Sequence, residues 1–146
     1  MKLFITWKRL KQQFWLSIAN LPMPGHGVRP FFVKMGGVKI QDWRNTYIGR
    51  NVSFDGVSPD MTIVEKGVRI TAGTIILTHF INPQTGSFDH EVVLIKRDAF
   101  IGTGTIITKP VTIGERAIVG AGSIVTKNIP DDEVWAGNPA RFIRKR

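Results

Sequence analysis

A six-residue period runs without interruption through residues 95–130 of this sequence. Each block opens with a branched aliphatic residue, and a small or β-branched residue follows four positions later. The block heads are Ile95, Ile101, Ile107, Ile113, Val119 and Val125, and the second positions are Ala99, Thr105, Val111, Ala117, Ser123 and Ile129. An α-helix repeats every 3.6 residues and a flat strand every two, so neither produces this pattern. The period predicts a mainly β fold, a solenoid in which each block is a short strand and a turn. An ordinary β-sandwich would need all these heads to fall in register by chance.

Three six-residue blocks make one triangular coil, so residues 95–112 and 113–130 supply two coils. Gly follows the head at positions 102, 114 and 120, where the backbone needs positive φ or close approach. The period continues upstream with one irregular step, from residue 54 to residue 64. A small bulge or turn is therefore expected near residues 56–60. The upstream heads are Ile48, Phe54, Val64, Ile70 and Ile76.

Between Ile76 and Ile95 the aliphatic heads are missing. The sequence there contains Asn-Pro, Thr-Gly and two histidines, which are turn signals and chemically active side chains. We therefore expect residues 82–91 to form a loop that leaves the prism. Loops on a rigid scaffold often carry function.

Residues 2–19 contain no Gly or Pro and repeat apolar residues at helical spacing: Leu3, Trp7, Leu10, Phe14 and Ile18. The segment predicts an amphipathic helix that is too short and too charged to span a bilayer. A basic helix with Trp and Phe on one face fits a membrane interface. Packing against the solenoid or a neighbouring subunit fits equally well. Prolines and glycines in residues 21–27 end the helix, and residues 28–40 are expected to hold one or two strands.

The formal net charge of +9 is concentrated in the N-terminal third. Residues 1–50 hold nine Lys or Arg and one acid, a net of +8, and the other 96 hold 11 against 10, a net of +1. An anionic membrane, a phosphorylated ligand or nucleic acid could be the partner. The basic residues lack the stacking aromatics or helix-turn-helix context of nucleic-acid readers, so we expect no nucleic acid. The chain has no cysteine, which excludes disulfides, thiolate metal sites and an acyl-cysteine intermediate. This composition and the absence of a signal-peptide core suit a cytoplasmic protein.

The run from Ile113 to Pro130, followed by Ala136-Gly-Asn-Pro-Ala-Arg-Phe-Ile-Arg144, resembles the C-terminal coils of hexapeptide-repeat acyltransferases. The likeness is greatest to the galactoside, maltose and nodulation type of O-acetyltransferase, and it covers residues 48–146. It implies a left-handed parallel β-helix over 48–135, followed by a basic tail (136–146). The expected helix and connector (1–47) lie outside the likeness. The resemblance also implies a homotrimer with active sites between subunits, and acetyl transfer from acetyl-CoA to a hydroxyl without a metal.

The resemblance assigns roles to individual residues. His79 takes the place of the general base, and Asp55 that of an acceptor-contacting Asn. His90 is a rival base, whereas His26 lies in the Pro/Gly connector and is expected to be structural. The residues that match coenzyme A contacts are Thr103, Ala121, Thr126, Lys127, Arg141 and Arg144.

The chemistry of an acetyl transfer is compatible with these residues. A hydroxyl is a weak nucleophile at neutral pH, and an imidazole, which ordinarily titrates close to that pH, can remove its proton. The Asp55 carboxylate could accept a hydrogen bond from the acceptor or orient the ring. Cations at one end of the slot would hold the phosphates of coenzyme A.

The leading hypothesis is a sugar O-acetyltransferase in surface-polysaccharide synthesis, whose acceptor is carried on a lipid at the inner membrane face. A non-catalytic β-helix scaffold is one alternative. A metal-dependent β-helix enzyme is another, but it would need about three histidines, and the chain has three in all, with His26 far outside the repeats.

Overall fold

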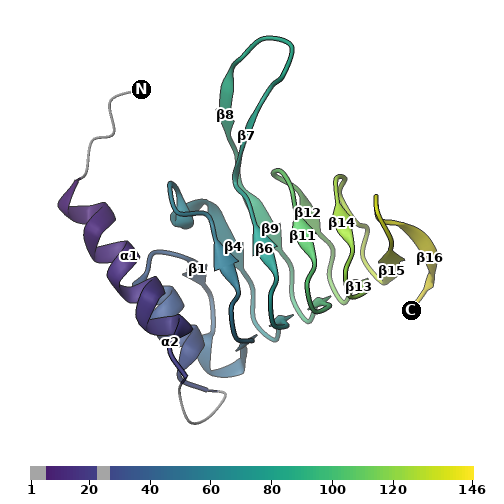
Figure 1. Ribbon diagram of the computed structural model, residues 1–146. Helices are drawn as coiled ribbons and strands as arrows, with labels where there is room; N and C mark the ends of the chain where they lie inside the picture. The colour runs from purple at the N-terminus through teal and green to yellow at the C-terminus, as the bar shows by residue number, and fades with distance from the viewer. Residues whose placement is uncertain (1–5, 23–26) are drawn as a thin grey trace.

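The computed structural model describes residues 6–22 and 27–146, which form a three-sided solenoid with helices at one end (Figure 1). Its strands pair in parallel with strands one coil away, and the predicted left-handed parallel β-helix is confirmed. Met1 to Ile5 and Met23 to His26 lie outside the described residues, so the expectations for Leu3 and His26 fall there too.

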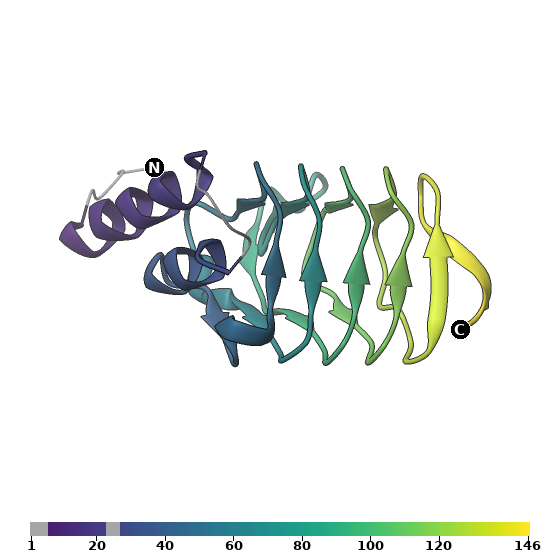
Figure 2. The same cartoon turned by 90° about the horizontal axis from the view of Figure 1, so that it is seen from below.

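Three sheets form the sides of the prism, and Figure 2 shows strands of successive coils side by side. Sheet 1 consists of β1 (Lys39–Ile40), β4 (Thr62–Val64), β9 (Val93–Ile95) and β12 (Thr112–Ile113). Sheet 2 consists of β2 (Tyr47–Ile48), β5 (Arg69–Ile70), β10 (Phe100–Ile101), β13 (Ile118–Val119), β15 (Glu133–Ala136) and β16 (Arg141–Lys145). Sheet 3 consists of β3 (Ser53–Phe54), β6 (Ile75–Ile76), β11 (Ile106–Ile107) and β14 (Ile124–Val125).

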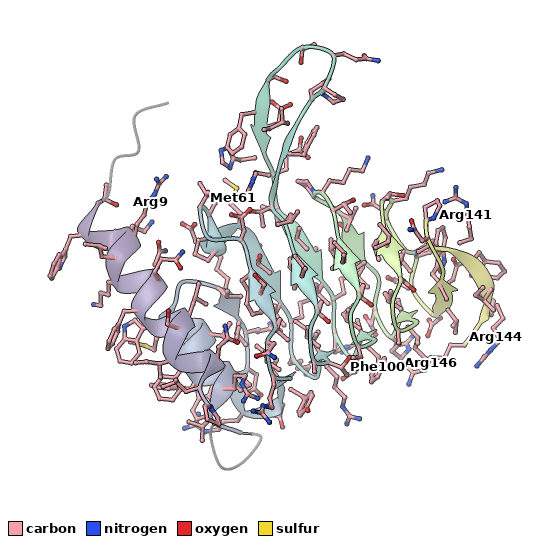
Figure 3. The ribbon with its side chains drawn as sticks, viewed as in Figure 1. Arg9, Met61, Phe100, Arg141, Arg144 and Arg146 are labelled. Atoms are coloured by element: carbon pink, nitrogen blue, oxygen red, sulfur yellow. The ribbon has the colours of Figure 1, made fainter. Side chains whose placement is uncertain are left out.

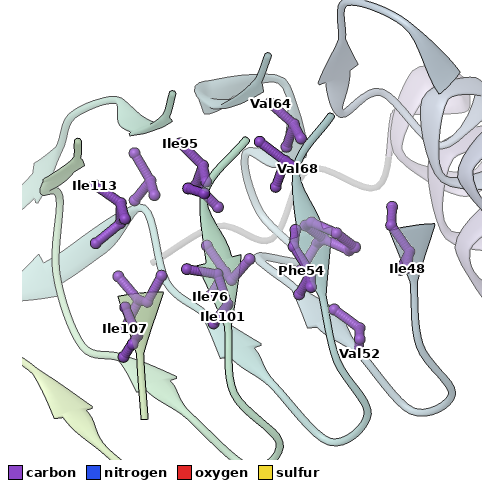
Figure 4. Packing of buried hydrophobic residues seen from close by; sticks show 14 of the residues in the cluster. Ile48, Val52, Phe54, Val64, Val68, Ile76, Ile95, Ile101, Ile107 and Ile113 are labelled. Carbon is purple, nitrogen blue, oxygen red and sulfur yellow. The ribbon is translucent and has the colours of Figure 1, made fainter. Parts of the chain in front are cut away.

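The interior of the prism is filled by the block heads and second positions, all of which are buried as predicted (Figure 4). Strand register stacks each head on the head of the next coil, as Ile70, Ile101 and Val119 do in sheet 2. Full burial of one such side chain contributes about 1.5–3 kcal/mol. Polar second positions are satisfied locally, since the buried Thr105 hydroxyl donates to the Gly102 carbonyl at 2.7 Å. The six-residue period thus maps directly onto columns of interior side chains.

Close stacking of coils explains the glycines that follow the heads. A Cβ at Gly102 would lie 2.4 Å from the backbone nitrogen of Ala121 in the next coil. No side chain fits at that distance.

The N-terminal segment forms two helices. Helix α1 (Trp7–Asn20) begins after Thr6, whose hydroxyl accepts a hydrogen bond from the Arg9 amide, and it ends before Leu21 as predicted. The expectation of one or two strands over residues 28–40 is wrong in its first half: helix α2 (Arg29–Met35) precedes the short strand β1. The sequence does contain boundary signals for this helix: Pro30 lies in its first turn and Gly36-Gly37 follow its last residue. The aromatic and β-branched residues between these signals favour a strand, which is why a strand was expected.

A buried arginine joins these helices to the solenoid. The Arg29 guanidinium donates from Nε to the Ala19 carbonyl at 2.7 Å and from Nη1 to the Ile48 carbonyl at 3.2 Å. The end of α1, the start of α2 and the first coil therefore meet at one side chain. Two short 3-10 helices, η1 (Trp43–Asn45) and η2 (Pro59–Met61), form connections in the first coils, the second within the turn expected near 56–60.

An antiparallel hairpin leaves the prism where aliphatic heads are missing from the sequence. It consists of β7 (His79–Ile81) and β8 (Phe88–His90), and it projects well beyond the coils (Figure 1). The excursion expected over 82–91 therefore starts earlier, at His79. At the far end, β16 folds back antiparallel on β15, so the basic tail is a strand.

Candidate active site

The edge between sheet 3 and sheet 1 brings together the two residues that sequence analysis singled out for chemistry. Phe54 of β3 pairs with Ile76 of β6, so the residues that follow these strands lie on neighbouring coils at the same edge. Asp55 comes directly after β3, and Thr78 and His79 follow β6. Coil register alone places the carboxylate beside the imidazole.

The carboxylate of Asp55 is completely buried and accepts five hydrogen bonds. Its Oδ1 accepts from the amides of Val57 at 2.8 Å and Ser58 at 3.3 Å. Its Oδ2 accepts from the Thr78 amide at 2.9 Å, from the Thr78 hydroxyl at 2.7 Å and from Nδ1 of His79. Burial opposes ionisation, but the hydrogen bonds from Thr78, Val57 and His79 outweigh it and lower the pKa of Asp55 to about 2.

An ionised Asp55 fixes the tautomer of His79. A carboxylate with a pKa of about 2 has no proton to give at neutral pH, so Nδ1 of His79 carries the hydrogen that joins them. The lone pair of the neutral ring is then on Nε2. The His79 side chain is 26% exposed, whereas that of Asp55 has no exposed surface. The pair thus keeps its carboxylate inside, while part of the imidazole reaches the surface.

This burial distinguishes between the two roles that the sequence left open for Asp55. A side chain with no exposed surface cannot meet an acceptor molecule, so the predicted acceptor contact does not fit the structure. Its geometry supports the other role, which is to orient the imidazole.

The hairpin forms a wall beside His79. In the β7–β8 register His79 lies opposite His90, and Ile81 opposite Phe88, so these four side chains share one face of the hairpin. The Phe88 ring centre is 4.9 Å from that of His79 and 4.6 Å from that of His90. Phe88 is 42% exposed. The imidazole therefore sits beside an accessible aromatic surface.

His90, the rival base, lacks the support that His79 has. Its ring centre is 6.0 Å from that of His79. Its Nδ1 is buried and has no hydrogen-bond partner within residues 6–22 and 27–146. Without a carboxylate to fix its tautomer, His90 is the less suitable base of the two.

The residues that match coenzyme A contacts lie on different edges of the prism. Thr103 and Ala121 are exposed on the edge between sheets 2 and 3, one coil apart, where the Gly122 amide donates to the Thr103 carbonyl at 2.8 Å. Thr126 and Lys127 follow β14 on the edge that also carries His79, and Lys127 is exposed.

The two tail arginines do not converge in the isolated chain. Figure 3 shows Arg141 toward the upper edge, on the side of the hairpin, and Arg144 near Arg146 on the lower side. Both lie on β16 and are exposed. In a single chain the six residues therefore lie in three places. Thr103 and Ala121 share one edge, Thr126 and Lys127 share a neighbouring edge, and the two arginines lie on the last strand, at the end of the solenoid.

Sequence reasoning missed the contributions of Thr78 and Phe88. Thr78 is fully buried and gives Asp55 two of its hydrogen bonds. The signal for Thr78 was present, because aligning the heads Phe54 and Ile76 places residue 55 opposite residue 77, next to Thr78. Phe88 had no such signal, since its position depends on hairpin register.

In the part of the chain that the structure describes, no group of three or more His, Cys, Asp or Glu side chains is placed to bind a metal ion. The metal-dependent alternative therefore gains no support from the geometry.

Comparisons with known proteins agree with this architecture. Residues 93–127 match the family model described as bacterial transferase hexapeptide (six repeats). A maltose O-acetyltransferase from Clostridium difficile 630 is 24% identical, with a TM-score of 0.63 over 94% of this chain and 86% of that one. A hexapeptide-repeat acetyltransferase from Vibrio cholerae, solved with acetyl coenzyme A, is 18% identical, with a TM-score of 0.70 over 94% and 86% of the two chains.

A galactoside acetyltransferase in complex with coenzyme A is also similar, at 24% identity and a TM-score of 0.60 over 94% of this chain and 80% of that one. No curated protein matches the sequence. At these identities the structural likeness establishes the fold. Together with the matched repeats, it confirms the hexapeptide-repeat β-helix that the sequence predicted.

Buried Asp55 predicts a specific dependence of stability on pH. Because folding lowers the pKa of Asp55 from 3.8 to about 2, its ionised form stabilises the fold above the unfolded pKa. This contribution is lost as the pH falls toward the folded value. We expect the free energy of unfolding to fall more for the wild type than for Asp55→Asn between about pH 5 and about pH 2.5, measured by urea denaturation. Asp60→Asn removes an exposed carboxylate that pairs with Lys8 and is the control. Parallel curves for wild type and Asp55→Asn would contradict the assignment.

Proposed function

We propose that this protein is an acetyl-CoA-dependent O-acetyltransferase that acetylates a hydroxyl of a sugar or saccharide. The observation that carries the proposal is the His79–Asp55 pair, in which a buried carboxylate holds the imidazole with Nε2 as its basic nitrogen. The fold shared with acetyltransferases and the absence of a cysteine nucleophile support direct transfer between two bound substrates.

In the proposed reaction Nε2 of His79 removes the proton from the acceptor hydroxyl as its oxygen attacks the thioester carbonyl carbon. A tetrahedral intermediate forms, its carbon–sulfur bond breaks, and the thiolate of coenzyme A takes the proton back from Nε2. The imidazolium formed on the way is stabilised by Asp55 through Nδ1. The carboxylate stays ionised throughout because its other hydrogen bonds persist.

The acceptor is proposed to lie against the hairpin wall. Phe88 offers an exposed aromatic face next to His79, and binding sites commonly combine such a face with a few polar groups. A sugar ring has both an apolar C–H face and hydroxyls, so it suits this surface. Saccharides of surface polysaccharides are the acceptor class that we favour.

The donor is proposed to bind along the two edges that carry matched residues. Lys127, Arg141 and Arg144 supply cations for the phosphates of coenzyme A, and exposed turns at Thr103 and Ala121 offer backbone groups to its extended arm. Because these residues do not converge within one chain, a slot completed by a neighbouring subunit accounts for all of them.

A flat apolar face supports assembly into the proposed homotrimer. Ile75, Ile106 and Ile124 are adjacent in the register of sheet 3, and each precedes a buried head, so their side chains point outward. All three remain partly exposed in the isolated chain. Three aligned isoleucines on the outside of a sheet favour burial against another subunit.

The proposed base is tested by substitution at His79. We expect His79→Ala to lower kcat by about 10²–10⁴-fold in a thiol-release assay with acetyl-CoA and a panel of sugars, because proton removal contributes that much. Asp55→Asn should lower kcat less, since it leaves the ring but loses its orienting charge. His90→Gln is the matched control and should keep most of the activity. A similar loss in His90→Gln and none in His79→Ala would reverse the assignment.

The donor site is tested by calorimetry with acetyl-CoA. The double variant Lys127→Ala/Arg144→Ala should bind acetyl-CoA at least about tenfold more weakly than the wild type, a loss of about 1.4 kcal/mol. Lys34→Ala/Lys39→Ala removes two exposed cations from the N-terminal third and should bind normally. If the wild type itself does not bind acetyl-CoA, the acetyltransferase proposal fails.

The assembly is tested by placing a charge on the flat face. Ile106→Glu should reduce the mass measured by sedimentation equilibrium from that of a trimer to that of a monomer, because an unpaired carboxylate cannot be buried in an interface. Ile143→Glu changes an exposed isoleucine on β16 and is the control. A wild type that sediments as a monomer would exclude the trimer.

A further inference from the structure

Helix α1 turns its apolar stripe away from the rest of the protein. Trp7 is 82% exposed, Leu10 51% and Phe14 58%. Together with Lys11 and Trp15 they line a shallow groove of about 600 Å³ on the outer side of the helix. These positions follow the i, i+3, i+4, i+7 spacing of a single helix face. The stripe that the sequence would use for packing is therefore at the surface of the described chain.

The opposite face of α1 attaches the helix to the protein. Gln12 and Ala19 are buried there, and at the border of the stripe the Trp15 ring stacks on Phe32 of α2 with ring centres 5.8 Å apart. Gln13 donates to the Gly56 carbonyl at 2.9 Å, and Lys8 pairs with Asp60 at 3.3 Å. Besides Trp15 and Leu16, these contacts use polar and small residues, so the exposed side chains of Trp7, Leu10 and Phe14 are not needed to hold the helix in place.

The helix that carries the stripe is cationic. Lys8, Arg9 and Lys11 lie in its first turns, and residues Trp7–Asn20 contain no acid. Aromatic and aliphatic side chains beside cations are the composition of helices that lie in the interface of anionic bilayers, where rings enter the headgroup region and cations meet phosphates. We propose that α1 docks the protein on an anionic lipid membrane through Trp7, Leu10 and Phe14.

A second copy of the chain fits this stripe less well. A symmetric contact would bring Lys11 of one chain toward Lys11 of the other, which is unfavourable. Helix α1 has no acid of its own to neutralise it, and Glu115, Asp131, Asp132 and Glu133 are already in ion pairs at the solenoid edges. An anionic bilayer supplies both the apolar layer and the negative charge that the stripe requires.

Docking through α1 would also orient the candidate site. Gln13 and Lys8 contact the turn of residues 56–61, and amides of that turn bind the Asp55 carboxylate. In Figure 1, α1 lies across the end of the solenoid with its first turns toward the top of the view, and the hairpin that carries His79 extends from the upper edge. In the proposed function, on which this step rests, such docking would hold the candidate site near a membrane that carries a lipid-linked saccharide.

The experiment is co-sedimentation of the full chain with vesicles, without acetyl-CoA or a sugar. We expect binding to phosphatidylcholine vesicles that contain phosphatidylglycerol, weak binding to pure phosphatidylcholine, and a decline with added salt. The variant Trp7→Ser/Leu10→Ser/Phe14→Ser should bind at least about tenfold more weakly. These side chains are exposed, so circular dichroism should show an unchanged fold.

The matched control is Phe142→Ser/Ile143→Ser, which removes two half-exposed apolar side chains at the far end of the solenoid and should bind like the wild type. Equal binding by the triple variant, or no binding by the wild type, overturns the proposal. A triple variant with a smaller mass in sedimentation equilibrium would assign the stripe to a subunit contact and also overturns it. Acetyl transfer is not measured, so a failure here leaves the proposed function untouched.

Discussion

Stacking of branched side chains in the interior of the prism is the constraint on which the rest of this structure depends. Each coil repeats the same columns, so backbone pairing between coils can have only one register. That register is what brings Asp55 beneath Thr78 and His79. A one-residue slip would turn every buried head outward and would separate the carboxylate from the imidazole. Stability and the geometry of the site therefore have the same origin.

The coils of the solenoid also supply the hydrogen bonds that keep the buried Asp55 carboxylate ionised. Removing Asp55 from water is unfavourable unless its lone pairs are satisfied, and the turn at Val57 and Ser58 together with Thr78 satisfies them. The remaining hydrogen bond goes to His79. The ring is thus positioned by a carboxylate that is itself fixed by its own turn and by Thr78 of the next coil.

The repeat made much of the fold predictable from the sequence. Heads such as Ile101 and Ile107 recur with a period that belongs to one architecture, and the lost period after Ile76 indicated where the hairpin leaves the coils. Helix α2 was not predictable, because Phe31, Phe32 and Val33 favour strands until Arg29 and the first coil give them a helical packing surface. Periodicity also located the stripe on α1 but not its direction. A pattern shows which residues share a face, and tertiary contacts decide whether that face is covered.

The reversed final strand has a consequence for how the molecule behaves among its own copies. A parallel coil has no natural end, since its last strands offer unpaired backbone groups that another chain could extend. Here β16 runs antiparallel to β15 and carries Arg141 and Arg144, while α2 packs at the opposite end next to β1 and β2. At both ends, therefore, a further coil would meet an element that is not part of the parallel repeat. Copies of the chain are thereby disfavoured from stacking end to end into a longer solenoid.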